Sequence, residues 1–412
     1  ITANNVNAAI SSGAKQLNTG GSLGLNLNGE SMIAHVWDGG QARATHQEIS
    51  GRLNIMDGIS GGSDHATHVC GTIGASGLNA PSKGMAPVCK INQYDWSNDV
   101  SEATSAAING MLLSNHSYGL INSGVPDWYF GAYITAARNW DLLMNSATYY
   151  LMVCAAGNDG TQNFNACPLN GNSAFDKLSW IALAKNNLTV ASAADYIPGN
   201  STIAASNFSS PGPADDLRIK PDICGNGELL VSSMGSGNNV YGTFSGTSMA
   251  SPNVTGTLVL LQQHYKNLNG TFMRAATIKG LALHTATDAL TLGPDSKSGW
   301  GYIDGKAAAK TISEVGSTSI VNELTLNNGS TYTLVVNSDG VTPLKASISW
   351  NDPTDSANFG SFCNVSSQTL VNDLDIELSY VNPNNGTTSI YQPWMLTSEA
   401  TNAKGNNSSD PF

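Results

Sequence analysis

Charged side chains are scarce in this sequence of 412 residues. Asp, Glu, Lys and Arg together make up 12% of it, where about 25% is usual. Only 18 residues are Lys or Arg, and the formal net charge is −12. Because nucleic acid is bound through basic contacts to phosphate, this balance disfavours a nucleic-acid partner. Low charge together with abundant Asn, Ser, Gly and Thr favours an exported protein.

Long apolar runs and closely spaced cysteine pairs are also missing. No stretch approaches the roughly 20 apolar residues of a membrane-spanning helix. The absence of a C-x-x-C pair argues against a zinc ribbon or a thioredoxin-type site. The six cysteines allow fifteen full pairings, so the sequence leaves the disulfide pattern open, although Cys70 and Cys154 lie in apolar stretches that favour buried thiols. The sequence starts at Ile1 without a charged-then-apolar leader, so we expect a targeting segment to have been removed or never present.

From Met32 to about Glu314, short apolar runs alternate with helical patterns. Apolar runs broken by glycine suit buried parallel strands, and apolar residues three or four apart suit helices. The expected strands are 32–37, 151–156 and 188–193, and the expected helices lie around 100–111, 130–142 and 254–261. This alternation predicts an α/β domain over residues 1–316, with a parallel sheet covered by helices on both faces.

The pattern changes after about Gly316. Segments that alternate apolar and polar residues with period two occur at 321–326, 331–336, 346–350 and 374–378. Asn-Gly and Asp-Gly pairs between them are typical hairpin turns. Residues 317–412 are therefore predicted to form an all-β sandwich domain. Because so few strands leave a sandwich incomplete, we expect further strands beyond Phe412.

Four polar residues occur at positions where α/β proteins commonly have active-site residues. Asp38 follows an apolar run, and active sites of open α/β sheets lie at the carboxyl ends of strands. His65 and Ser248 each stand at the start of a helical pattern, and Asn158 follows a strand. A serine hydroxyl becomes a good nucleophile when a histidine takes its proton, and a carboxylate orients that histidine. An Asn amide and the N–H groups of a helix start can stabilise an oxyanion.

Each of these residues alone has an ordinary structural explanation as a cap, a turn or a surface residue. Together, and in this order, they resemble the subtilisin-like serine proteases (subtilases). The block from His65 to Thr72, HATHVCGT, resembles the HGTHVAGT block of that family, with Ala66 for Gly and Cys70 for Ala. The segment 246–252, GTSMASP, resembles its serine block. Further similar elements are GMAP at 84–87, AAGN at 155–158, FSSPGP at 208–213 with RIKPD at 218–222, and GWG at 299–301.

The C-terminal region indicates which branch of the subtilase family the sequence resembles. The segments 348–353 and 370–376 are similar to the β-barrel, a jelly-roll-like domain, of kexin-like and oxidatively stable alkaline subtilisins. In that branch the barrel continues for several strands past the point where this sequence stops.

The resemblance implies a role for each site residue. Ser248 would be the nucleophile, His65 the general base, Asp38 the orienting carboxylate, and Asn158 an oxyanion donor together with the Ser248 N–H. An extended peptide would pair with Ser117, Tyr118 and Gly119, and its specificity pocket would be bounded by Ala155, Ala156 and Gly157. The pocket floor is expected in 163–172, which contains no Asp or Glu. The expected activity is therefore a broad endopeptidase that prefers large apolar residues.

The resemblance also implies a structural calcium ion, a propeptide during maturation and a monomeric protease acting on polypeptides. Asp373 and Asp375 are the candidate ligands, because residues two apart on a strand share a face. Solvated carboxylates are the ordinary alternative at these positions. Two other functions stay open: a catalytically silent subtilase fold, and an acyl transferase that excludes water from the acyl-enzyme. A binding role for the C-terminal aromatic residues also stays open.

Overall fold

The central element of the molecule is a parallel sheet of seven strands. The computed structural model describes residues 5–58, 61–199, 202–357, 360 and 362–412, so Ile1 lies outside the described part. In spatial order the strands are β2 (Leu53–Ile55), β3 (Lys90–Asp95), β1 (Ile33–Asp38), β4 (Leu113–His116), β5 (Leu151–Ala155), β6 (Leu188–Ala193) and β7 (Ile223–Asn226). All six neighbouring pairs are parallel, as the apolar runs predict.

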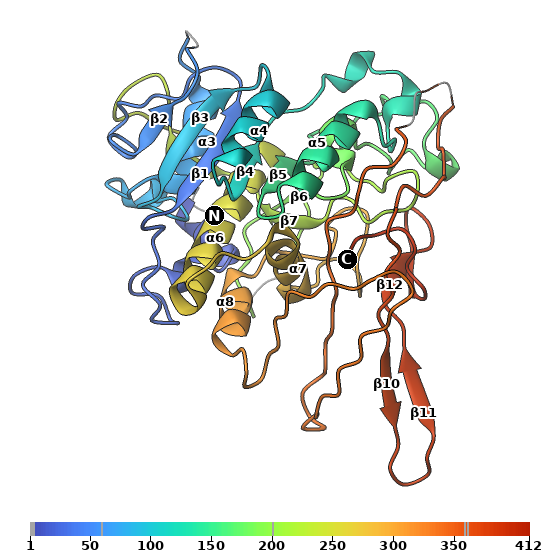
Figure 1. Ribbon diagram of the computed structural model, residues 1–412. Helices are drawn as coiled ribbons and strands as arrows, with labels where there is room; N and C mark the ends of the chain where they lie inside the picture. The colour runs from blue at the N-terminus through green and yellow to red at the C-terminus, as the bar shows by residue number, and fades with distance from the viewer. Residues whose placement is uncertain (1–4, 59–60, 200–201, 358–359, 361) are drawn as a thin grey trace.

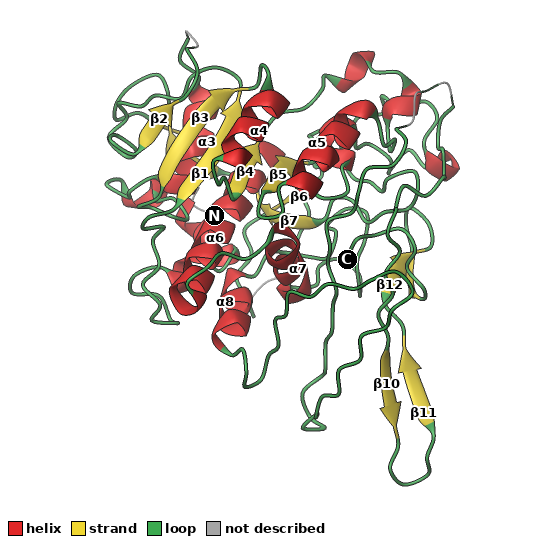
Figure 2. Ribbon diagram, viewed as in Figure 1, coloured by secondary structure: helices red, strands yellow, loops and turns green. Residues whose placement is uncertain are grey.

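Helices cover both faces of this sheet (Figures 1 and 2). The helices are α1 (Asn5–Ser11), α2 (Ala14–Leu17), α3 (Asp64–Gly74), α4 (Asp99–Ile108), α5 (Thr135–Ser146), α6 (Thr247–Asn269), α7 (Ala275–Thr285) and α8 (Gly305–Ser313). Successive side chains of β1 point to opposite faces. Val36 packs in the core shared with α3 and α6, and Trp37 packs in the core shared with α4 and α5. The expectation of a sheet covered on both sides is confirmed.

Short elements complete the framework. The 3-10 turns are η1 (Ala80–Ser82), η2 (Asn122–Gly124), η3 (Asp127–Tyr129), η4 (Leu169–Gly171) and η5 (Trp180–Leu183). A small antiparallel pair, β8 (Leu230–Ser233) and β9 (Tyr241–Phe244), precedes α6. No helix among the described residues is long and apolar enough to cross a membrane.

Helix α6 is the core helix of the molecule. Among its residues from Thr247 to His264, only Ser248 is not buried. Small residues allow this close packing: a Cβ on Gly256 would lie 2.6 Å from the Met85 Cβ. The helix ends at Gly270, which adopts φ 75, a left-handed conformation that glycine takes without strain.

The C-terminal region departs from the prediction. Its strands are two small antiparallel pairs, β10 (Leu378–Val381) with β11 (Thr388–Tyr391) and β12 (Trp394–Leu396) with β13 (Asn402–Lys404). The segments expected as strands at 321–326, 331–336 and 346–350 are not strands, and 374–378 reaches only the start of β10. The prediction of these strands is wrong because their alternating apolar side chains face no second layer. Val335, for example, is 88% exposed.

This region is nevertheless attached to the sheet domain by a buried ion pair. The ammonium of Lys185 lies 2.5 Å from a carboxylate oxygen of Asp352, and neither side chain is exposed. Lys185 also donates to the carbonyl groups of Pro353 and Thr369, each at 2.6 Å. By contrast, the hairpin β10–β11 extends away from the rest of the molecule (Figure 1).

Candidate active site

Four polar residues converge on the sheet edge where β1, β4 and β5 end. Asp38 is the last residue of β1, and Asn158 lies three residues after β5. His65 is the second residue of α3, and Ser248 is the second residue of α6. In a parallel sheet all strands end at the same edge, so this arrangement follows from the topology.

The carboxylate of Asp38 orients the imidazole of His65. Asp38 Oδ1 lies 2.8 Å from His65 Nδ1, and the side chain of Asp38 is almost fully buried. The Gly39 N–H donates to the same oxygen at 2.8 Å. Ser63 fixes the start of α3, because its hydroxyl accepts the Ala66 N–H at 3.0 Å. A proton on Nδ1 leaves Nε2 free to accept a proton.

The same contact sets the basicity of His65. Burial alone would lower the pKa of this imidazole, but the hydrogen bond to Asp38 and its negative charge outweigh burial and raise the pKa. The side chain remains 39% exposed, so a substrate and water can reach it.

Ser248 is held at the junction of α6 and the end of β4. Its hydroxyl donates to the Ser117 carbonyl at 3.1 Å, and the Ser117 hydroxyl donates to the Ser248 carbonyl at 3.0 Å. Among the described residues no hydrogen bond joins Ser248 to His65. Catalytic hydrogen bonds often close only once substrate is bound, so this arrangement is compatible with a nucleophile at rest.

Asn158 and the start of α6 surround a small space that can hold an anion. The Asn158 Oδ1 accepts the Thr247 N–H at 2.9 Å and the Thr247 hydroxyl at 3.1 Å, which leaves its Nδ2 as the donor. A Cβ on Gly246 would lie 3.6 Å from both that Nδ2 and the Asn158 Oδ1, and 3.7 Å from the Ser248 N. Gly246 has φ 156, which favours glycine. Its missing side chain therefore leaves a space between two N–H donors.

The expected substrate segments follow two neighbouring strands. Ser117, Tyr118 and Gly119 come after β4, and 155–157 ends β5 and the residues beyond it, with His116 paired to Cys154 in the parallel register. The Tyr118 side chain points inward, since its hydroxyl donates to Asp99 at 2.7 Å. Gly119 is exposed. The backbone at Gly119 is thus the part of this segment that an extended chain can reach, whereas Ser117 and Tyr118 are buried.

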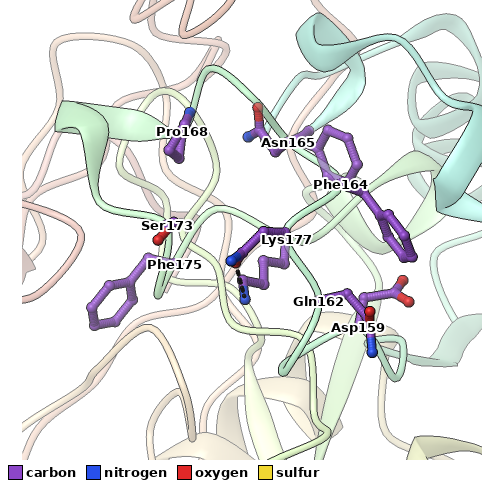
Figure 3. Close-up of a pocket in the computed structure, with 10 residues that line it drawn as sticks. Asp159, Gln162, Phe164, Asn165, Pro168, Ser173, Phe175 and Lys177 are labelled. Atoms are coloured by element: carbon purple, nitrogen blue, oxygen red, sulfur yellow. Dashed lines mark hydrogen bonds between the residues drawn. The ribbon is translucent and has the colours of Figure 1, made fainter.

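A pocket begins one residue after Asn158 (Figure 3). Its cavity volume is about 10 Å³, which is room for roughly one water molecule. It is lined by Phe130, Asp159, Gln162, Asn163, Phe164, Asn165, Pro168, Ser173, Phe175 and Lys177. Four of these residues lie in the floor segment 163–172 expected from the sequence. The sequence reasoning missed the other six, because they lie elsewhere in the chain or flank the segment: Phe130, Asp159, Gln162, Ser173, Phe175 and Lys177.

Lys177 is the unexpected charge in this pocket. Its ammonium is partly buried and donates to the Gly160 carbonyl at 2.7 Å. Asp159 lines the same pocket and its negative charge acts on this ammonium, so the lining combines an opposite-charge pair with three phenylalanine rings.

Other candidates have structural environments. The neighbouring His68 is fully buried, stacks on Phe244 and contacts the Leu230 carbonyl through Nε2 at 3.0 Å. Cys70 and Cys154 are buried, as the sequence suggested. Asp373 and Asp375 are exposed, and the described residues bring no third acidic, His or Cys side chain to them to complete a metal cluster.

Comparisons with known proteins agree with this architecture. A parallel sheet with an Asp–His pair at its carboxyl edge and helices on both faces is the subtilisin-like α/β fold. Residues 37–301 match the Subtilase family, and the chain belongs to that family.

Several relatives and solved structures are similar to parts of the chain. An alkaline proteinase of Hapsidospora chrysogena is 30% identical over 57% of this chain and 52% of its own length. The major intracellular serine protease of Bacillus subtilis is 29% identical over 50% of this chain and 58% of its own length. The chain thus spans about half the length of the curated relatives it matches. Fervidolysin from Fervidobacterium pennivorans shares the fold, with a TM-score of 0.52 and 23% identity over 72% of this chain and 45% of its own.

Proposed function

We propose that this chain is a serine endopeptidase in which Ser248, His65 and Asp38 act as a catalytic triad. The observation that supports this most directly is the 2.8 Å contact between Asp38 and His65, at the same sheet edge as Ser248. The family supplies the chemistry: its characterised relatives include serine proteases, which act on polypeptides.

In the proposed reaction, the Ser248 hydroxyl turns from the Ser117 carbonyl toward His65 and attacks the scissile carbonyl carbon. His65 Nε2 takes the hydroxyl proton, and Asp38 stabilises the resulting imidazolium. Collapse of the tetrahedral intermediate breaks the C–N bond, and His65 returns the proton to the leaving amine. A water molecule then hydrolyses the acyl-enzyme by the same route.

Asn158 Nδ2 and the Ser248 N–H would hold the negative oxygen of each intermediate. The space left by Gly246 supports this, since both donors border it. Such donors stabilise the charge that develops in the transition state more than the neutral substrate, so they raise kcat.

Substrate would bind as an extended strand against 117–119, with one side chain in the pocket beside Asn158. The rings of Phe130, Phe164 and Phe175 offer apolar surface to a large apolar side chain. The pocket admits such a side chain only when its lining moves, because its cavity volume is about 10 Å³. The floor segment 163–172 contains no acidic residue, and Lys177 offsets the charge of Asp159 in the lining. We therefore propose broad cleavage after large apolar residues rather than after dibasic sites.

Several properties of the whole protein are proposals from family resemblance and composition. They are secretion, maturation with a propeptide, and a monomeric state. The assignment to the kexin-like, oxidatively stable branch rests on the segments 348–353 and 370–376. The boundary between a catalytic domain at 1–316 and a β domain at 317–412 is supported by the end of α8 at Ser313.

A structural calcium ion is proposed less specifically. Asp373 and Asp375 offer oxygen ligands, and burial together with the charge of Asp375 raises the pKa of Asp373. Calcium takes six to eight oxygens, and these two residues do not by themselves supply such a set. An unchanged thermal midpoint in the presence of a calcium chelator would remove calcium from the proposal.

Casein hydrolysis tests the function. We expect cleavage that a fluorophosphonate abolishes, with the label on Ser248, and no cleavage by Ser248→Ala. Product masses showing ligation to an added amine would favour an acyl transferase, and a folded protein without cleavage or label would indicate a silent fold.

A further inference from the structure

The C-terminal region touches the loop that forms the proposed pocket. Cys167 lies in that loop between two pocket-lining residues, Asn165 and Pro168. The amide of Asn364 donates to the Cys167 carbonyl at 3.0 Å and lies 4.0 Å from the Cys167 sulfur. Cys363 precedes Asn364 in the chain, and the Cys167 thiol is among the groups that act on its pKa. These contacts bring together two cysteines nearly two hundred residues apart in the chain.

This pair differs from the other cysteines. Cys70, Cys89, Cys154 and Cys224 are fully buried. Cys167 and Cys363 are partly exposed, so a small oxidant can reach them. The residue after Cys363, Asn364, has a left-handed backbone (φ 57), which is a conformation that Asn tolerates.

We propose that Cys167 and Cys363 form a disulfide that ties the pocket loop to the C-terminal region. With oxidised glutathione as the oxidant, one thiolate attacks its S–S bond, forms a mixed disulfide and releases one glutathione. The second cysteine then attacks the mixed disulfide, which forms the protein S–S bond and releases the second glutathione. The two cysteines lose two protons and two electrons, and glutathione disulfide gains them.

The environment of Cys363 disfavours its thiolate. Burial, together with the neighbouring Cys167, raises the pKa of Cys363 to about 11.

The loop is held by polar contacts at present, and a disulfide would add a covalent one. Asp176 accepts the Leu169 N–H at 3.0 Å and the Asn165 amide at 2.9 Å. A bond that closes so long a stretch of chain restricts the unfolded state strongly. We expect reduction to lower the thermal midpoint by about 5–10 °C. Resting on the proposed function, we also expect a several-fold higher KM for substrates with a large apolar side chain in the pocket.

The test is differential alkylation of the full chain after equilibration with oxidised or reduced glutathione. Six thiols should react in the denatured reduced protein and four in the oxidised protein, and a non-reduced digest should contain one linked peptide pair with positions 167 and 363. In the variants Cys167→Ser and Cys363→Ser the remaining cysteine should be found as a glutathione adduct. Because these readouts do not depend on proteolysis, they stay informative if the proposed function fails.

Two results would overturn the proposal. One is that six thiols remain in the wild-type protein after oxidation. This measurement does not depend on whether a variant folds. The other is that either cysteine is linked to a different partner.

Discussion

Replacing Asn158 separates its catalytic contribution from its structural one. The two polar atoms of the side chain have different roles. Oδ1 accepts the N–H and hydroxyl of Thr247, and Nδ2 borders the space beside the Ser248 N. Asn158→Leu removes both the acceptor and the donor. Asn158→Asp keeps the acceptor for Thr247 and removes the donor.

The two variants therefore differ in stability but not in the direction of their kinetic effect. Loss of one oxyanion donor costs about 10²–10³ in kcat, or roughly 3–4 kcal/mol of transition-state stabilisation. The Leu variant also leaves the buried Thr247 N–H without an acceptor, which costs about 1–3 kcal/mol of folding free energy. The Asp variant spares most of that cost, and its negative charge repels the oxyanion, so its kcat should fall at least as far.

Peptide kinetics and urea unfolding of both variants measure these effects. We expect KM to change little, because the donor acts mainly on the charge of the transition state. The reasoning is refuted if the Asp variant retains wild-type kcat while folded. A drop in kcat confined to the Leu variant would instead indicate that Asn158 acts only by holding Thr247.

Three further outcomes are expected. The raised pKa of His65 keeps its imidazole protonated to a higher pH. As the pH is lowered, kcat/KM should therefore fall with a midpoint above the usual histidine pKa of about 6.5. A pH–rate profile with a lower midpoint would contradict this. Asp352→Ala leaves the buried Lys185 ammonium without its carboxylate and should cost about 3–5 kcal/mol in urea unfolding, whereas a loss below about 1 kcal/mol would show that the pair is not buried in solution. Met249 is almost fully buried in the core, so mild peroxide should reduce activity only modestly, and complete inactivation with Met249 sulfoxide in the peptide map would show that the sulfur is reachable.

The sheet domain could be predicted because its signals are local. Each apolar run that ends in glycine is a strand by itself, and a parallel sheet brings all strand ends to one edge. From the common edge of the strand ends one can predict that Asp38 and Asn158 lie close together, near the helix starts that carry His65 and Ser248. It does not give side-chain contacts, such as the hydrogen bond between Ser248 and Ser117.

The structure of the C-terminal region was harder to predict, because an alternation of apolar and polar residues describes only one strand at a time. The pattern in 331–336 shows which side chains would share a face, but not whether a second layer covers that face. The pocket was only partly predictable for a related reason. Phe130 and Lys177 reach it from separate segments, and the pairing of Cys167 with Cys363 depends on how the C-terminal region folds back.

The proposed nucleophile, Ser248, and the proposed substrate-binding segment 117–119 are joined by one buried residue. Asn115 in β4 accepts the hydroxyls of Ser251 at 2.8 Å and Thr255 at 3.1 Å, both from α6. Its amide donates to the Ser117 hydroxyl at 2.9 Å, and that hydroxyl donates to the Ser248 carbonyl. Helix α6 and the end of β4 are therefore fixed to each other by neutral hydrogen bonds in the interior. A shift of either element would break several of these bonds at once, so we expect Ser248 and the backbone of 117–119 to keep their spacing when a substrate binds.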